Sequence, residues 1–430
     1  MKSFFDGIPT KRARQRAVVV GVFKKNESHL EQNPLDEIIS LCKTAGARVV
    51  GSVIQHVEKI NPATMLGSGK TDELAVMARE REANLVIFDS DLSSSQQVNI
   101  EKLIKVPVVD RPGIILDIFA LHARTREAKL QVELAQLEYL LPRLAGGWTH
   151  LERQEGSIGT RGPGETQLET DRRLVRKRIG DLRQKLKVIE TERHTQRKQR
   201  DGLFKVCLVG YTNAGKSTLF NLLTGEDVLA ESYLFATLDS TTRRVKFSGR
   251  NALLLSDTVG FIRKLPVSLV ASFKSTLMEV SGADLLLHVI DISDPYFEDR
   301  ISTVNSILEE IGAGEIPVIH AFNKIDLRDD PDLYRSLLGR FPGGRFISAV
   351  TGEGSGRIKS DLESRLESSK VTITARIGAR SSEQLNLISS LGQLLDSVSD
   401  DGVLTVKARI PKTALGKLSA GGVELISTDE

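Results

Sequence analysis

A glycine-rich octapeptide, Gly210–Ser217, fits the pattern G-x-x-x-x-G-K-S/T. The apolar run Phe204–Val209 precedes it and Thr218–Leu223 follows it, so we expect a strand, a phosphate-binding loop and a helix. Glycines let such a loop turn tightly, so that its N–H groups face phosphate oxygens. We expect Lys216 to reach the β- and γ-phosphates and the Ser217 hydroxyl to hold Mg²⁺. The residues expected around the phosphates are Gly210, Tyr211, Thr212, Asn213, Ala214, Gly215, Lys216 and Ser217.

A polar, loop-like stretch after this motif carries a candidate switch segment. Thr237 is expected to complete the Mg²⁺ shell, with Thr241 and Thr242 as alternatives. The residues of this segment expected beside the nucleotide are Phe235, Ala236, Thr237, Leu238 and Asp239.

A buried run, Leu253–Ser256, leads into a D-x-x-G motif. We expect Asp257 to contact Mg²⁺ through water and the Gly260 N–H to face the γ-phosphate. Lys216, Thr237 and Gly260 are therefore the expected catalytic residues. The motif consists of Asp257, Thr258, Val259 and Gly260.

A third motif, N-K-x-D, follows the apolar run Ile316–Phe322 and selects the base. The Asp326 carboxylate can accept hydrogen bonds from N1–H and the exocyclic amino group of guanine, which adenine does not offer in that arrangement. A missed buried hydrogen bond is heavily penalised, so the motif predicts GTP and GDP as ligands. The residues expected near the base are Asn323, Lys324, Ile325 and Asp326, with Ser348, Ala349 and Val350 from a later loop.

The residue after D-x-x-G limits how hydrolysis can proceed. Ras-like enzymes have a glutamine there that orients the attacking water, whereas this chain has Phe261. We therefore expect slow intrinsic hydrolysis that a partner or another loop must assist. Asn213 is a candidate ligand for K⁺ beside the phosphates, which would supply positive charge. The alternative is that Asn213 only shapes the loop.

Bulk properties set limits on the class of protein. The 430 residues suggest about two to four domains. The two cysteines, Cys42 and Cys207, exclude a disulfide framework and fit a reducing compartment. No stretch approaches about 18 uninterrupted apolar residues, so we expect no membrane span.

Four domains are predicted, and their fold class is α/β. Residues 1–122 alternate strands and helices, which predicts a parallel α/β domain. The run Leu66–Thr71 resembles a second phosphate loop, but its spacing fails, so a nucleotide site there is the less favoured interpretation. Residues 123–200 predict a helical coiled-coil arm, 201–367 the phosphate-loop domain, and 368–430 a small C-terminal α/β domain. In that last domain we expect strands at Lys370–Arg376 and Val403–Arg409, with a helix at Ser382–Val398 between them.

The arm has two leucine-rich seams that should pair antiparallel. A Gly-rich segment, Gly146–Glu165, joins them and holds the only tryptophan of the chain. From Arg143 to Arg200 there are 15 Lys and Arg against 8 Asp and Glu, although the net charge of the whole chain is only +3. This segregated charge favours an RNA or DNA partner over a merely solvated coiled coil.

The combined motifs resemble the HflX family, within the TrmE–Era–Obg–HflX superfamily. They are the phosphate loop, F-A-T-L-D, D-T-V-G-F-I, N-K-I-D and the segment Gly159–Glu169. The resemblance implies a GTPase that binds the large ribosomal subunit and splits or rescues stalled ribosomes, which stimulate hydrolysis. It also implies that the Gly-rich loop reaches ribosomal RNA. The family's frequent proline after F-A-T-L-D is Ser240 here.

Other interpretations stay open at this point. A ribosome-assembly GTPase that acts on large-subunit precursors would share the motifs. An ATP-dependent RNA-remodelling protein would act through its N-terminal domain. We expect a cytoplasmic monomer that uses Mg²⁺, with a peripheral membrane fraction as an alternative location. A tRNA-modifying relative is disfavoured because no cysteine lies near the C-terminus.

Overall fold

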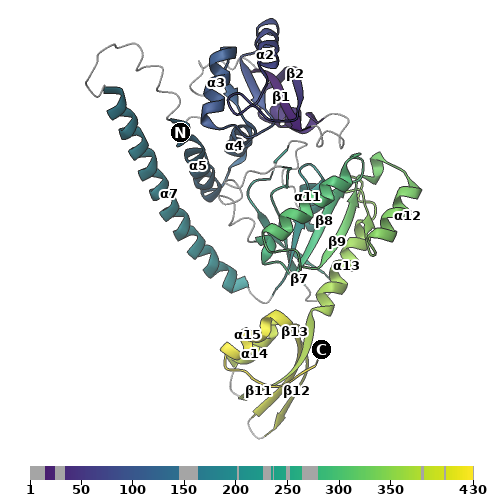
Figure 1. Cartoon of the computed structure of the whole chain (residues 1–430). Coiled ribbons are helices and arrows are strands. Elements are labelled where there is room, and N and C mark those ends of the chain that lie inside the picture. Colours follow the sequence, from purple (N-terminus) through teal and green to yellow (C-terminus); the bar gives the residue numbers. More distant parts are fainter. Residues whose placement is uncertain are drawn as a thin grey trace. The chain divides into compact units, whose positions relative to one another are not determined.

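The computed structural model describes residues 15–24, 34–144, 163–200, 203–225, 234–235, 237–247, 252–263, 279–378, 382–400 and 403–429 (Figure 1). The chain divides into two compact units. The described residues of Met1–Ile189 and of Ser232–Leu238 belong to the first unit. Those of Glu190–Glu231, Asp239–Arg263 and Ser275–Glu430 belong to the second.

A four-stranded parallel sheet, in the order β2-β1-β3-β4, forms the centre of the N-terminal domain. Strand β1 is buried along almost its whole length, as expected for a parallel strand that helices cover on both faces. The expected alternation of strands and helices is therefore confirmed. The elements are β1 (Arg16–Lys24), α1 (Asp36–Thr44), β2 (Arg48–Val57), α2 (Ser68–Glu80), β3 (Leu85–Phe88), α3 (Ser94–Ile104), β4 (Val108–Val109) and α4 (Arg111–His122).

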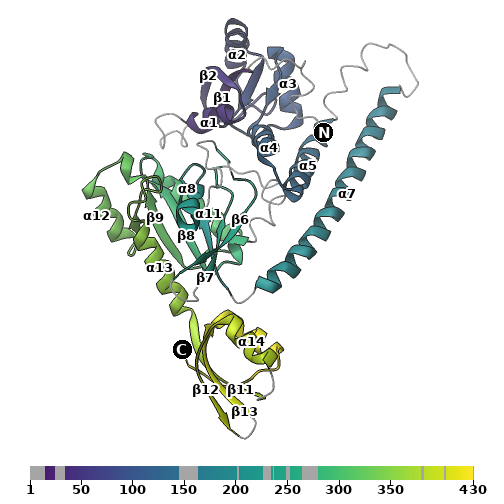
Figure 2. The same cartoon turned by 180° about the vertical axis from the view of Figure 1, so that it is seen from behind.

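In the described part of the arm lie the helices α5 (Arg126–Leu140) and α7 (Pro163–Arg200). They run side by side in opposite directions (Figures 1 and 2). Leu134 and Leu137 of α5 share one apolar cluster with Ile179 and Leu182 of α7, so the expected seams do meet. Of the predicted Gly-rich segment Gly146–Glu165, residues 146–162 lie outside the described residues, and the last three residues belong to α7, which begins at Pro163.

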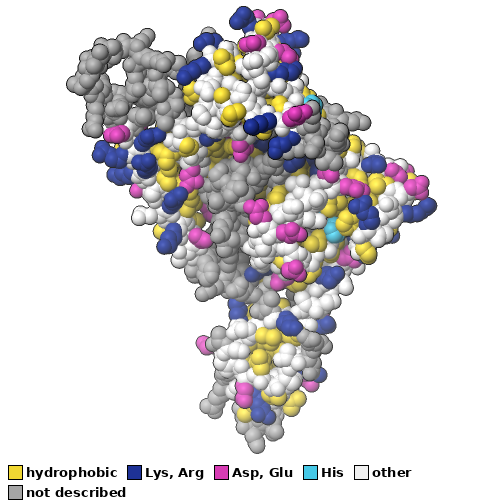
Figure 3. Space-filling model, viewed as in Figure 1, with side chains coloured by type: hydrophobic (Ala, Val, Ile, Leu, Met, Phe, Trp, Pro, Cys, Tyr) yellow, Lys and Arg dark blue, Asp and Glu magenta, His cyan; other side chains and the backbone are white. Residues whose placement is uncertain are grey.

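The outer surface of α7 is basic. Figure 3 shows Lys and Arg side chains gathered over this helix. A long exposed row of cations creates a positive potential that attracts polyanions. The exposed cations among the described side chains of α7 are Arg173, Arg176, Lys177, Arg178, Arg183, Lys185 and Lys187.

A six-stranded sheet, in the order β10-β9-β8-β5-β7-β6, lies in the second unit. All its pairs are parallel except β6 with β7, which makes β6 an antiparallel edge strand. Ligands of such sheets bind beyond the carboxyl ends of the strands. The elements are β5 (Phe204–Val209), α8 (Lys216–Thr224), β6 (Thr241–Lys246), β7 (Ala252–Asp257), β8 (Leu285–Asp291), α11 (Phe297–Glu310), β9 (Val318–Asn323), η3 (Ile325–Leu327), α12 (Pro331–Arg340), β10 (Arg345–Phe346) and α13 (Ser355–Ser368).

The C-terminal domain is an antiparallel sheet, in the order β12-β13-β11-β14, with a β-α-β-β-α-β chain order. The helix expected over Ser382–Val398 is a wrong prediction, because α14 ends at Leu391 and β12 follows. Gly392 separates them, and a Cβ there would lie 2.2 Å from the Arg409 carbonyl oxygen. The elements are β11 (Lys370–Gly378), α14 (Ser382–Leu391), β12 (Gln393–Asp400), β13 (Val403–Pro411), η4 (Lys412–Ala414), α15 (Leu415–Ala420) and β14 (Glu424–Asp429).

Candidate active site

The octapeptide forms the loop after β5 and the first two residues of α8, the strand–loop–helix order that the sequence predicts. Two of its glycines are required by the backbone. Gly210 has φ 149°, and a Cβ there would lie 2.3 Å from the Val289 carbonyl oxygen. Gly215 has φ 94°, and its Cβ would lie 2.3 Å from Asn323 Nδ2. Both positions therefore exclude side chains, which keeps the loop close to its neighbours.

Lys216 is buried at the start of α8. Its Nζ donates hydrogen bonds to the carbonyl oxygens of Gly210 (3.2 Å) and Tyr211 (2.8 Å). Burial lowers the pKa of Lys216 to about 8, against the opposing charge of Asp257. An anionic ligand beside this amine would favour its charged form, so the site is suited to phosphate.

Two of the three residues expected around Mg²⁺, Ser217 and Asp257, lie together. The Ser217 hydroxyl donates a hydrogen bond of 2.7 Å to Asp257 Oδ2, and Asp257 is fully buried. A hydroxyl and a carboxylate are hard oxygen ligands, the kind that Mg²⁺ prefers, and Mg²⁺ takes its other ligands from phosphates and water. The residues present therefore fit this ion.

The D-x-x-G segment and the residue after it are hydrogen-bonded to β5 and to the phosphate loop. The Thr258 hydroxyl donates to the Leu208 carbonyl oxygen at 2.6 Å. Phe261 N–H donates to the Gly210 oxygen at 3.1 Å, and Thr212 N–H donates to the Phe261 oxygen at 2.8 Å. The Phe261 side chain is itself buried. It therefore contributes backbone pairing rather than a group that could orient water.

Gly260 lies between the hydrogen-bonded residues Thr258 and Phe261 and has no room for a side chain. A Cβ there would lie 2.8 Å from Thr212 Cγ2 and 3.0 Å from Lys216 Nζ. Val259, which precedes it, is half-buried.

The candidate switch segment is only partly described, since Ala236 lies outside the described residues. Its first residues pack within the first unit. Leu234 N–H donates to Thr44 Oγ1 at 3.3 Å, and the Phe235 ring meets Phe119 edge to face, with centroids 4.8 Å apart. Leu238 is buried, and Thr237 and Asp239 are half-buried. A role for Thr237 in holding Mg²⁺ stays a prediction.

The alternatives to Thr237 lie on β6. The hydroxyls of Thr242 and Ser256 form a hydrogen bond of 2.8 Å. Thr241 is the register partner of Asp257.

Asn323 joins two loops of the site. Its Nδ2 donates to the Ala214 carbonyl oxygen at 2.8 Å, and its Oδ1 accepts from Ala349 N–H at 2.9 Å. Asn323 is buried, so both bonds are shielded from water. The asparagine of the N-K-x-D motif therefore also connects the phosphate loop with the loop that contains Ala349.

The remaining residues expected near the base lie on the same edge of the sheet. Asp326 is exposed within η3, Ser348 is fully buried and Val350 is 79% exposed. Lys324 adopts a left-handed backbone (φ 68°), and its Nζ contacts Asp291 Oδ2 at 2.6 Å. Asp291 was not predicted from the sequence, although its place at the carboxyl end of a separate apolar run, Leu285–Ile290, was a usable signal.

Three family models match the chain. "GTP-binding GTPase N-terminal" matches residues 32–120, and "GTP-binding GTPase Middle Region" matches 122–200. "50S ribosome-binding GTPase" matches 205–324, which contains the phosphate loop, D-x-x-G and N-K-x-D. Together with the site geometry, these matches define the chain as a P-loop GTPase.

Curated relatives narrow the class. GTPase HflX of Escherichia coli is 43% identical over 93% of this chain and 94% of its own length. GTPase HflX of Flavobacterium psychrophilum is 53% identical over 73% of this chain and 76% of its own. The chain belongs to the HflX family of GTPases.

A solved structure described as "crystal structure of SsGBP and GDP complex" is 25% identical to this chain. The match covers 82% of this chain and 98% of that one, with a TM-score of 0.47.

Within the described part of the chain, no helix has the length and apolar character needed to cross a membrane.

Proposed function

We propose that this GTPase binds the large ribosomal subunit and splits or rescues stalled ribosomes, and that the ribosome stimulates its GTP hydrolysis. The match of residues 205–324 to the model "50S ribosome-binding GTPase" carries this proposal. The basic outer surface of α7 supports an RNA partner, because cations that neutralise backbone phosphates supply most sequence-independent affinity. A ribosomal partner would place the protein in the cytoplasm.

Nucleotide state would control ribosome binding through the two switch segments. In the proposal GTP orders Thr237 and Gly260, which favours the ribosome-bound form, and hydrolysis releases the protein. Mg²⁺ would be held by Ser217 and Thr237, with Asp257 acting through water, and would neutralise phosphate charge.

The test is sedimentation of the full chain with ribosomal particles. We expect more protein to sediment with large subunits in a non-hydrolysable GTP analogue than in GDP, and intact 70S particles to separate in GTP. Equal sedimentation in both nucleotides would contradict the switch. Nucleotide-dependent binding to precursor particles without separation of 70S particles would instead indicate an assembly GTPase.

We also propose that Asn213 holds K⁺ beside the phosphates, where positive charge would stabilise the transition state. Asn213 is exposed and has φ 62°, a left-handed conformation that asparagine tolerates, so the loop-shaping role remains the alternative. Asn213→Gly separates the two, because glycine keeps the backbone and removes the side-chain oxygen. Faster hydrolysis in KCl than in NaCl, lost in Asn213→Gly, is expected. Equal rates in both salts would remove the cation site.

A further inference from the structure

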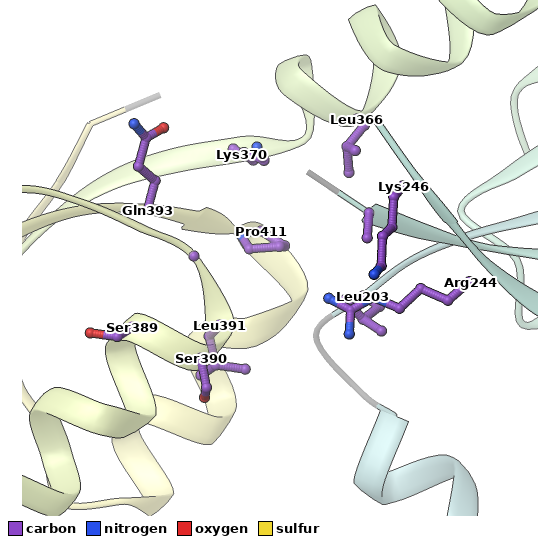
Figure 4. A pocket seen from close by; sticks show the side chains of 12 residues that line it. Leu203, Arg244, Lys246, Leu366, Lys370, Ser389, Ser390, Leu391, Gln393 and Pro411 are labelled. Carbon is purple, nitrogen blue, oxygen red and sulfur yellow. The ribbon is translucent and has the colours of Figure 1, made fainter. Parts of the chain in front are cut away.

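A pocket with a volume of about 370 Å³ lies where the edge strand β6 faces elements of the C-terminal domain. All the residues that line it belong to the second unit. Figure 4 shows Arg244 and Lys246 extending from β6 into this space, opposite Leu391 and Pro411. Alternate residues of a strand point to the same face, which is why these two cations lie together.

The positive charge of this pocket is not compensated. Arg244 and Lys246 are exposed, and within the described part of the chain neither forms an ion pair. A third lining cation, Lys370, contacts Glu367 Oε1 at 2.7 Å. No Asp or Glu is among the described residues that line the pocket. Two free cations in a concave surface therefore favour an anionic ligand.

The other walls of the pocket are mixed. Leu391 and Pro411 supply apolar surface, and Ser389 and Gln393 also line the pocket. A guanidinium can bind two oxygens of one phosphate, and a neighbouring ammonium adds a point charge. A free phosphate ion would leave most of the cavity to water, whereas the sugar of a nucleotide could cover the apolar wall.

We propose that this pocket binds a backbone phosphate of RNA through Arg244 and Lys246. The inference rests on the proposed function, since it names a contact for the same ribosomal partner. It gives the C-terminal domain a role, because the domain completes the pocket around cations that β6 supplies.

The experiment measures binding of the full chain to deproteinised large-subunit ribosomal RNA over a series of KCl concentrations. The test variant is Arg244→Gln/Lys246→Gln, which keeps most of both side-chain stems. The matched control is Arg243→Gln, an exposed cation on the same strand that does not line the pocket. Circular dichroism and GDP affinity establish that both variants are folded.

We expect the double variant to bind RNA about tenfold more weakly. Its slope of log affinity against log salt should fall in magnitude by about 0.7 to 0.9 for each lost phosphate contact. Arg243→Gln should match the wild type. Three results would overturn the proposal: an unchanged slope in the double variant, an equal loss in the control, or competition by polyglutamate that is stronger than competition by RNA.

The same proteins separate this inference from the proposed function. If the wild-type protein sediments with ribosomes equally in both nucleotides, that result counts against the proposed function but not against this inference. The salt slopes on free RNA still decide whether Arg244 and Lys246 bind phosphate.

Discussion

Replacing Asn323 with alanine should loosen two loops at once. The side chain bonds to the Ala214 oxygen and the Ala349 N–H, and both bonds are buried. Leaving a buried donor or acceptor without a partner costs about 1–3 kcal/mol. Two such losses, softened by local relaxation, should total about 2–4 kcal/mol. Because 1.4 kcal/mol corresponds to a factor of ten, local opening should become about 30 to 700 times more frequent.

Hydrogen exchange of the nucleotide-free protein, followed by mass spectrometry, measures this opening. Peptides that contain Ala214 and Ala349 should exchange faster in Asn323→Ala, and GDP should bind more weakly. Asp326→Ala is the matched control, because Asp326 is exposed and should lose base contacts without loosening the loops. The reasoning fails if exchange in Asn323→Ala equals that of the wild type, or if Asp326→Ala accelerates it equally.

Three further predictions concern the same domain. Gly260→Ala should lower GTP turnover by about a hundredfold while GDP still binds, because the new Cβ displaces the backbone beside Thr212. Unchanged turnover would contradict the close packing at Gly260. Calorimetry in buffers of different ionisation enthalpy should show proton uptake on GDP binding at pH 9 but little at pH 7, because the pKa of Lys216 is about 8 without phosphate. Equal uptake at both pH values would be inconsistent with that pKa. Burial lowers the pKa of His288 from 6.5 to about 3, so the unfolded chain binds more protons between these values and stability should fall as pH drops below 6.5. His288→Asn should reduce this acid sensitivity in thermal unfolding, and an identical pH profile would assign it to other groups.

The fold class could be predicted because its signals are local. Strand–helix alternation predicts a parallel sheet wherever the runs are long and β-branched, as in Ala17–Phe23. The guanine nucleotide could be predicted because Asn323 and Asp326 belong to one contiguous motif.

Features that depend on distant residues could not be predicted. The sequence of β12 has a weak pattern that favours helix, and its pairing with β13 decides its structure. The dual role of Asn323 depends on Ala214 and Ala349, which only the folded sheet brings within hydrogen-bond distance. The contact of Phe235 with Phe119 likewise has no local signal.

The two backbone hydrogen bonds between the phosphate loop and Phe261 make movement of the D-x-x-G segment cost free energy. Gly260 lies directly before Phe261, so any large movement of its N–H must break both bonds or carry the loop along. Breaking two such bonds costs about 1–3 kcal/mol. A nucleotide that demanded this movement would bind about 5 to 150 times more weakly than one that did not. If GTP demands this movement, contacts to its γ-phosphate, such as the one expected from the Gly260 N–H, must offset that cost before GTP binds as tightly as GDP.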